Sequence, residues 1–176
     1  EFYVMERIKG VILRADLPAE LGLDEQSTRE LCKSFIDRMV ELHNVDYQAC
    51  GLGDLGKPEG YVKRQIEGWI ERYQRALTED APAWTDVMQW LRDKMPADHP
   101  KPGLVHNDYR FDNVILDPDN PMRIIGVLDW EMTTIGDPLM DLGNSLAYWI
   151  EASDPAPVQL MRRQPSHAPG MLTRQT

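Results

Sequence analysis

Residues 106–113 read HNDYRFDN, and Asp129 follows Asn113 by sixteen positions, in the stretch VLDWE. Short apolar runs flank both stretches, so their two acidic groups and one amide are expected at strand ends that converge on one point of space. Phosphoryl transfer needs such a set: a carboxylate that orients and accepts the proton of an attacking hydroxyl, and hard oxygen ligands for Mg²⁺. Asp108 fits the first role, and Asn113 and Asp129 fit the second.

Upstream of this stretch, three segments show helical periodicity. The first begins near Ser27, which forms a capping-box signature with Glu30. The second runs from about residue 59 to residue 77, and the third from about residue 80 to just before Pro96. In the third segment, the residues expected to face inward are Trp84, Val87, Met88 and Leu91. The upstream half of the chain is therefore expected to be helical.

Short strands separated by turns surround the polar stretch, in GLV, NVIL and RIIGVLD. Asp137 and Pro138 then match the N-cap and first-turn preferences of a last helix, which continues through Ile150. Frequent Pro and polar residues after Ser153 predict a loop or a frayed end. The sequence thus predicts an α+β fold, mainly helical, with short β-hairpins that carry the polar stretch.

A second motif, GLGDLG at residues 51–56, spells G-x-G-x-x-G, by which dinucleotide-binding folds and protein kinases cover phosphates. A dinucleotide site of this kind needs a strand before the glycines and a helix after them. Here helical patterns both precede and follow the glycines. We therefore predict a loop between two helices, with no nucleotide bound to it.

The composition is that of a soluble globular domain. The 176 residues carry 19 basic and 29 acidic side chains, a formal net charge of −10. This charge argues against nucleic acid and against anionic membrane surfaces as partners. Cys32 and Cys50 have no metal-type spacing and are expected to be reduced thiols. Because no apolar run is long enough to span a bilayer, and no leader opens the chain, we expect a cytoplasmic protein.

Taken together, the motifs resemble those of one family. The spacing H-x-D-x-x-x-x-N in HNDYRFDN resembles the catalytic loop of protein kinases and, more closely, that of the aminoglycoside phosphotransferase and choline kinase superfamily. Asp129 and the following IGDPLMDLG continue as that superfamily does. GDLGKPEGY, RQIEGW and LDWEMTTIGDPLMDLGNSL resemble one branch, the phosphotransferase domains that occur alone in bacteria or fused to acyl-CoA dehydrogenases. The resemblance reaches to about Ile150.

The resemblance implies ATP and Mg²⁺ as cofactors and a role for each residue of the polar stretch. Asp108 would be the catalytic base, and Asn113 and Asp129 would be the Mg²⁺ ligands. His106 is expected to support the loop through hydrogen bonds. Arg110 would either make a bidentate contact to the transferred phosphate or form a salt bridge with a neighbouring carboxylate.

The opening FYVMERIKG looks like the strand and hinge that join the two lobes of a kinase. In such a hinge the backbone C=O of Glu6 and the N–H of Ile8 would meet the adenine edge, and Met5 would line the pocket. Asp141 resembles a buried aspartate that accepts backbone N–H bonds from the catalytic loop. His43, by contrast, is expected to cap the C-terminus of its helix.

These likenesses divide the chain into three parts. Residues 1–10 would be the end of an N-terminal-lobe strand and the hinge, residues 11–152 a kinase-like C-terminal lobe, and residues 153–176 a Pro-rich loop or truncated tail. A kinase also needs an N-terminal lobe with a glycine-rich loop and a strand Lys, and the chain lacks one. We therefore expect a piece of a longer protein, with little or no activity alone and with self-association through the truncated face.

The predicted function is transfer of the ATP γ-phosphate to the hydroxyl of a small molecule. The fused relatives suggest a hydroxylated acyl or acid acceptor, and the acidic charge is also compatible with a cationic aminoglycoside. Two other functions stay open at this point: a catalytically silent binding module and a metal-dependent phosphohydrolase. The intact Asp108, Asn113 and Asp129 argue against the first, and the hinge-like segment argues against the second.

Overall fold

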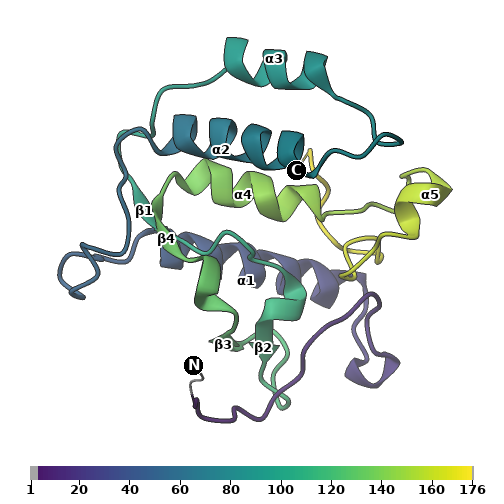
Figure 1. Cartoon of the computed structure of the whole chain (residues 1–176). Helices are drawn as coiled ribbons and strands as arrows, with labels where there is room; N and C mark the ends of the chain where they lie inside the picture. The colour runs from purple at the N-terminus through teal and green to yellow at the C-terminus, as the bar shows by residue number, and fades with distance from the viewer. Residues whose placement is uncertain (1–3, 176) are drawn as a thin grey trace.

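The computed structural model describes residues 4–175 of the chain. Its helices and 3-10 turns are η1 (Ala19–Leu21), α1 (Glu25–His43), α2 (Tyr61–Ala76), α3 (Thr85–Asp93), η2 (Phe111–Asn113), η3 (Trp130–Met132), α4 (Pro138–Ala147) and α5 (Ala156–Gln159). Its strands are β1 (Gly103–Val105), β2 (Val114–Leu116), β3 (Ile124–Val127) and β4 (Thr134–Gly136). Figure 1 shows α4 between α1 and α2, with α3 on the far side of α2.

Helix α1 begins earlier than its sequence pattern suggested. The N-cap is Asp24, whose carboxylate accepts a hydrogen bond from the Ser27 N–H at 2.8 Å, while the Ser27 hydroxyl accepts one from the Asp24 N–H at 2.9 Å. The predicted box of Ser27 with Glu30 is therefore wrong, and Ser27 occupies the third helical position instead. Aspartate caps a helix at least as well as serine does, and the earlier start adds helical hydrogen bonds.

Two antiparallel two-stranded sheets lie beside α1 and α4: β1 pairs with β4, and the consecutive strands β2 and β3 form a hairpin. Gly103 of β1 faces Gly136 of β4. A Cβ at Gly103 would lie 2.4 Å from the His43 carbonyl oxygen, and one at Gly136 would lie 2.5 Å from the Tyr61 ring. Only glycine fits at these two positions, because the end of α1 and the start of α2 lie too close to this sheet for a Cβ.

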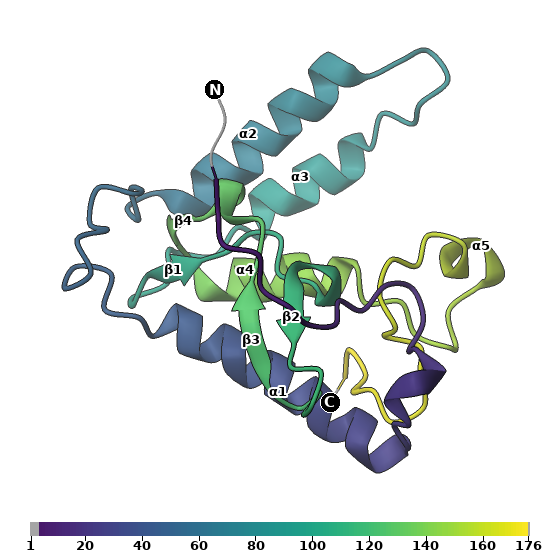
Figure 2. The same ribbon diagram turned by 90° about the horizontal axis from the view of Figure 1, so that it is seen from below.

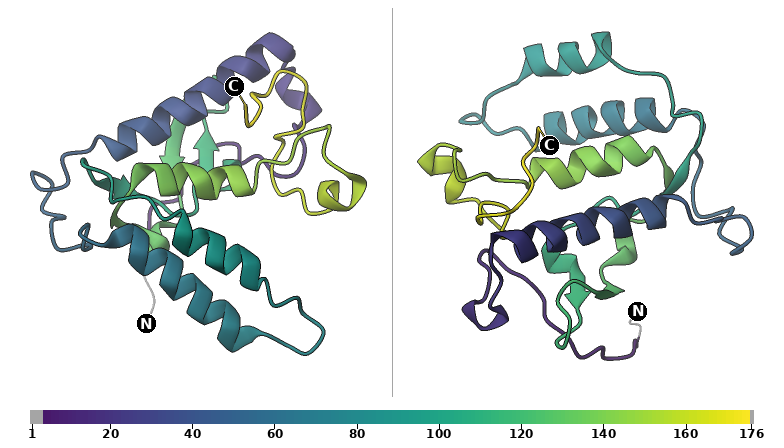
Figure 3. Two further views of the ribbon diagram at one scale, coloured as in Figure 1. Left: turned by 90° about the horizontal axis from the view of Figure 1, so that it is seen from above. Right: turned by 180° about the vertical axis from the view of Figure 1, so that it is seen from behind.

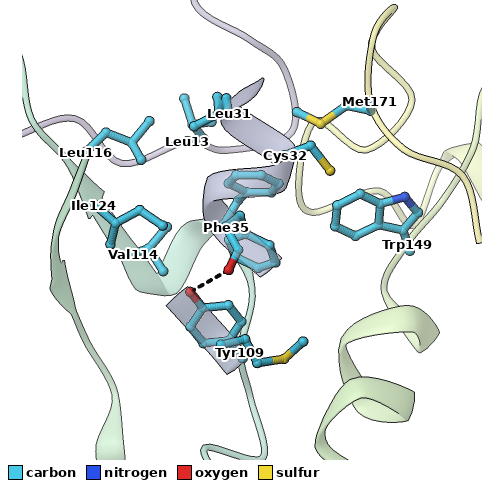
Figure 4. Close-up of a cluster of buried hydrophobic side chains, with 12 residues drawn as sticks. Leu13, Leu31, Cys32, Phe35, Tyr109, Val114, Leu116, Ile124, Trp149 and Met171 are labelled. Carbon is cyan, nitrogen blue, oxygen red and sulfur yellow. Dashed lines mark hydrogen bonds between the residues drawn. The ribbon is translucent and has the colours of Figure 1, made fainter. Parts of the chain in front are cut away.

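The main hydrophobic core forms around Phe35 of α1. Its ring stacks on Phe111 with centroids 4.1 Å apart, and its carbonyl accepts a hydrogen bond from the Tyr109 hydroxyl at 3.0 Å, drawn as a dashed line in Figure 4. Trp149 completes the aromatic cluster, with its ring 6.2 Å from that of Phe35. Two members of this core come from the polar stretch itself, so the core anchors HNDYRFDN directly.

Helices α2 and α3 form a hairpin that projects from the rest of the molecule (Figure 3). GLGDLG at residues 51–56 lies in the connection between α1 and α2, which confirms the predicted loop. Helix α3 starts at Thr85, later than expected, and buries Met88 alone among its residues, whereas Trp84 and Val87 are exposed. The predicted inward face is wrong for those two, because α3 packs mainly on α2 and leaves both side chains open to solvent.

The opening segment does not form the predicted strand within the described residues. Val4 to Lys9 has no regular secondary structure, and Phe2 and Tyr3 lie outside the described residues. A strand needs a partner along its length, and the pairing described for this segment is the single bridge between Val11 and Leu116. The segment instead runs along the β2–β3 hairpin (Figure 2).

The part of the chain after α4 is irregular apart from α5, yet it is packed and not frayed. The side-chain Oε1 of Gln164 accepts a hydrogen bond from the Phe111 N–H at 3.0 Å, and the backbone carbonyl of Leu172 accepts one from the Trp149 indole at 2.8 Å. Ser166 is buried and bonded to the backbone of Ile150. The tail therefore closes one side of the core.

Within residues 4–175, no helix is both long and apolar enough to cross a membrane.

Candidate active site

The polar stretch folds so that its side chains alternate between core and solvent. Tyr109 and Phe111 are fully buried, whereas Asp108, Arg110 and Asp112 point the other way and are partly exposed. A short extended run followed by the 3-10 turn η2 produces this alternation. The aromatic pair thus holds the backbone, and the charged groups are presented together on one face.

Asp108 and Asn113 meet across this turn. The Asn113 side-chain nitrogen donates to the Asp108 carboxylate at 3.0 Å and to the Asp108 carbonyl oxygen at 2.8 Å. Because the amide nitrogen is engaged in this way, the amide oxygen is the atom that Asn113 offers to a cation. The structure brings these two predicted residues into direct contact.

Asp129 lies beside this pair through the backbone of β3. The Leu128 N–H donates to the Asn113 carbonyl at 2.8 Å, which places the next residue, Asp129, close to the turn that carries Asn113. Asp129 is exposed and adopts a left-handed conformation with φ of 65° at the start of η3. A left-handed conformation is uncommon outside glycine, asparagine and aspartate. The described residues hold no cluster of three His, Cys, Asp or Glu side chains at metal-binding spacing.

His106 is buried and both of its ring nitrogens have partners. One nitrogen, Nδ1, accepts a hydrogen bond from the Asp108 N–H at 3.2 Å, so the other, Nε2, carries the proton and donates to the Leu128 carbonyl at 2.8 Å. The ring therefore links the start of the polar stretch to the end of β3. Its side chain is fully buried.

Arg110 is paired with two carboxylates. Its guanidinium lies 3.3 Å from Asp108 and 3.0 Å from Asp112, and its central carbon sits 4.7 Å above the Tyr148 ring. In the described state the salt bridge, one of the two predicted alternatives, is therefore the contact that Arg110 makes. Its position next to Asp108 also places a positive charge at the edge of the candidate site.

Asp141, a fully buried residue of α4, holds the start of the loop. It accepts hydrogen bonds from the His106 N–H at 3.0 Å and the Asn107 N–H at 2.7 Å, as the family resemblance implied. A third bond joins it to His43 Nε2 at 2.8 Å. The predicted helix-capping role of His43 is therefore wrong: α1 ends against β1, and its last side chain turns inward to the carboxylate.

Asn107 is a site residue that sequence reasoning missed. Its φ of 63° is left-handed, and its side chain accepts from the Tyr61 hydroxyl at 3.1 Å and donates to the Met132 carbonyl at 2.9 Å. The Asn144 side chain donates to its carbonyl. Burial raises the pKa of Tyr61, so its hydroxyl keeps the proton that it donates. The sequence offered one indication of this role: Asn107 directly precedes Asp108, and asparagine tolerates the left-handed conformation better than most residues.

A cleft of about 840 Å³ opens beside Asn107, between α2, η3, the start of β4 and α4. Its lining is mixed, with polar groups from Tyr61, Gln65, Arg72, Asn107, Glu131 and Asn144. Asn107, the residue directly before Asp108 in the chain, belongs to this lining, whereas Asp108 and Asn113 do not. It has the size of a small-molecule site.

The residues of the predicted hinge lie apart from this cleft, on the β2–β3 hairpin. Met5, Glu6 and Ile8 are exposed. The end of the Ile8 side chain lies 3.1 Å from where a Cβ on Gly126 would stand. The structure therefore places this segment over the hairpin whose open end carries both Asn113, before β2, and Asp129, after β3.

The sequence model of the family described as "Phosphotransferase enzyme family" matches residues 1–173. Acyl-CoA dehydrogenase family member 11 from Gallus gallus is 38% identical over 151 residues, which are 85% of this chain and 19% of that protein. Acyl-CoA dehydrogenase family member 10 from Mus musculus is 38% identical over 156 residues, 88% of this chain and 14% of that protein. The chain thus spans less than a fifth of these relatives.

Solved structures agree with this match. A Ralstonia eutropha JMP134 protein classed as an aminoglycoside phosphotransferase superposes with a TM-score of 0.73 and 39% identity, over 82% of this chain and 44% of that one. An aminoglycoside-3'-phosphotransferase of type VIII superposes with a TM-score of 0.57 and 19% identity, over 87% of this chain and 56% of that one. The fold, with its mixed helices and small antiparallel sheets, is therefore the kinase-like fold of aminoglycoside phosphotransferases.

Proposed function

The chain belongs to the phosphotransferase enzyme family, as its motifs predicted, and we propose that it acts in an ATP- and Mg²⁺-dependent small-molecule kinase. The observation that carries this proposal is the contact of Asp108 with Asn113 at 3.0 Å, with Asp129 brought alongside by the Leu128 backbone. We infer that this base, amide oxygen and second carboxylate act together on an acceptor that enters through the cleft at Asn107. This is the set of groups that transfer of a γ-phosphate to a hydroxyl requires.

In this proposal Asp108 orients the acceptor hydroxyl and takes its proton. Asn113 and Asp129 offer hard oxygen donors, which fit Mg²⁺, and the ion would neutralise charge on the phosphates of ATP. His106 is a positioning residue, because it is buried and bonds both the Asp108 N–H and the Leu128 carbonyl. Most of the rate enhancement would come from positioning and charge stabilisation.

Arg110 is proposed to contact the transferred phosphate. In the described state its guanidinium already lies 3.3 Å from the Asp108 carboxylate, at the edge of the site. A phosphate that carries more charge than a carboxylate would compete for the same planar donors. The Arg110 guanidinium would then leave the Asp108 carboxylate and bind the phosphate, while Asp112 keeps the guanidinium oriented.

Adenine is proposed to lie against the opening segment, where the Glu6 carbonyl and the Ile8 N–H would bond its edge and Met5 would cover its face. These residues are exposed and run over the β2–β3 hairpin, which supports this placement because the same hairpin leads to both proposed metal ligands. The acceptor hydroxyl would enter from the other side, through the cleft at Asn107.

The acceptor is proposed to be a hydroxylated acyl or acid metabolite, since the curated relatives carry the name of acyl-CoA dehydrogenases. We further propose a cytoplasmic protein with no nucleic-acid or membrane partner, and a tendency to self-associate through exposed apolar surface. The 176 residues alone are expected to turn over slowly, because GLGDLG lies between helices and cannot serve as the glycine-rich loop over the phosphates.

The proposed metal role of Asp129 is tested by nucleotide binding to the intact protein that contains this chain. Asp129→Ala should weaken Mg-ATP binding about tenfold or more, while ATP affinity measured in a chelator stays unchanged. The matched control is Asp119→Ala, which removes an exposed aspartate from the turn at the other end of the same hairpin and should leave both affinities unchanged. Equal Mg-ATP affinity in the two variants would remove Asp129 from the site.

A further inference from the structure

An apolar groove of about 570 Å³ lies between α2 and α3, where the helical hairpin opens toward α4. Its walls include Trp69 and Tyr73 of α2, Trp84 and Val87 at the start of α3, and Met140 of α4. No residue of this groove takes part in the chemistry proposed for Asp108. Its volume falls in the range of small-molecule pockets.

The groove is continuous with the polar cleft beside Asn107. Gln65, Trp69 and Met140 line both spaces. A single molecule can therefore lie across these three residues, with one end in the cleft and the other in the groove. The polar end would then adjoin the residue that precedes Asp108.

The groove is apolar, and several of the side chains that line it are exposed to solvent. Trp69, Trp84 and Val87 are 57%, 52% and 43% exposed, respectively. Large apolar side chains that share one hollow gain free energy when an apolar ligand replaces water. The Arg72 guanidinium lies 4.8 Å from the Trp69 ring, on the side of the cleft, so the boundary between apolar and polar lining falls at Trp69.

We propose that this groove binds an apolar segment of the phosphate acceptor, while the acceptor hydroxyl lies in the cleft next to Asp108. The acceptor class is then an amphiphile: a hydroxyl-bearing polar head joined to an apolar chain. The inference rests on the proposed function, because it assigns the acceptor of that same site. It excludes fully polar polyols as the preferred acceptors.

The test is a binding series on the intact protein with alkyl glucosides, from methyl to octyl, each below its micelle concentration. These probes keep one uncharged hydroxylated head and vary only the tail. Calorimetry should show a dissociation constant that falls up to about fourfold for each added methylene while the tail lies in the groove. A dissociation constant independent of tail length would overturn the inference.

The groove is identified by two matched variants. Val87→Gln places an uncharged polar side chain in the groove, and Val40→Gln makes the same change at a 48% exposed helical valine of α1, outside the groove. Val40→Gln should keep the dependence on tail length, and Val87→Gln should flatten it, with the urea midpoints of both near that of the parent. The same response in both variants would place the tail elsewhere and refute the inference.

Phosphate transfer and self-association are measured in separate experiments, so that failure of the kinase proposal can be distinguished from failure of the groove inference. If the tail dependence is present but the intact protein phosphorylates no hydroxyl compound with Mg-ATP, the kinase proposal fails and groove binding stands. If short hydroxyl compounds are phosphorylated with no benefit from a longer tail, the groove inference fails and the kinase proposal stands. If light scattering shows a dimer that Val87→Gln dissociates, a second copy of the chain covers the groove, and the inference fails.

Discussion

Asp141→Asn tests how the buried carboxylate of α4 holds the start of the loop. The carboxylate accepts from two backbone N–H groups, of His106 and Asn107, and bonds His43 Nε2, all within 3.0 Å. Asparagine has nearly the same shape, but it keeps one acceptor oxygen and turns an NH₂ group toward a donor. One charge-assisted hydrogen bond is lost and one buried N–H is left unpaired. The free energy of unfolding should fall by about 2–4 kcal/mol.

Urea unfolding followed by tryptophan fluorescence measures this change. With a denaturant slope of about 2 kcal/mol/M, the midpoint should fall by about 1–2 M. The control is Asp86→Asn, which makes the same chemical change at an exposed position in the first turn of α3 and should shift the free energy by less than about 0.5 kcal/mol. A shift for Asp141→Asn no larger than that of Asp86→Asn would refute the reasoning.

Two further predictions concern the walls of the cleft. Gly143→Ala adds a methyl group inside α4 that meets no atom within 4 Å, so the free energy of unfolding in urea should rise by about 0.5–1 kcal/mol. Because Gly143 lines the cleft, the KM for the acceptor should also rise. A lower free energy of unfolding would contradict this prediction. Burial raises the pKa of Tyr61 above its usual 10.0, so the unfolded state loses the proton first and stability should fall as pH rises from about 10. Urea titrations at about pH 9 and about pH 11 should show a smaller fall for Tyr61→Phe, and equal falls would contradict the assignment.

Local patterns were sufficient for much of the site. The structure confirms the predicted Asp137 cap of α4, whose carboxylate accepts from the Leu139 N–H at 2.8 Å. The loop at residues 51–56 and the contacts of Asp141 with the polar stretch were also predicted correctly. These features depend on residues close in sequence, or on a motif whose contacts the family resemblance supplied.

The features that sequence reasoning missed depend on contacts between distant segments. His43 ends α1, and nothing local distinguishes a capping histidine from one that reaches a carboxylate 98 positions away. The inward face assigned to α3 failed because periodicity shows that a helix has an apolar side but not whether a second layer covers it. Val87, which the helical periodicity assigned to the inward face, instead lines the proposed acceptor groove.

The most direct test of the proposed chemistry compares two aspartates that flank one arginine. Asp108→Asn and Asp112→Asn each remove one carboxylate that contacts Arg110, without changing the size of the side chain. With an acceptor and Mg-ATP, turnover by the intact protein should fall about 10²–10⁴-fold in Asp108→Asn and less than about tenfold in Asp112→Asn, with Mg-ATP affinity retained in both. Turnover retained in Asp108→Asn, or lost equally in both variants, would contradict the role of Asp108 as the base.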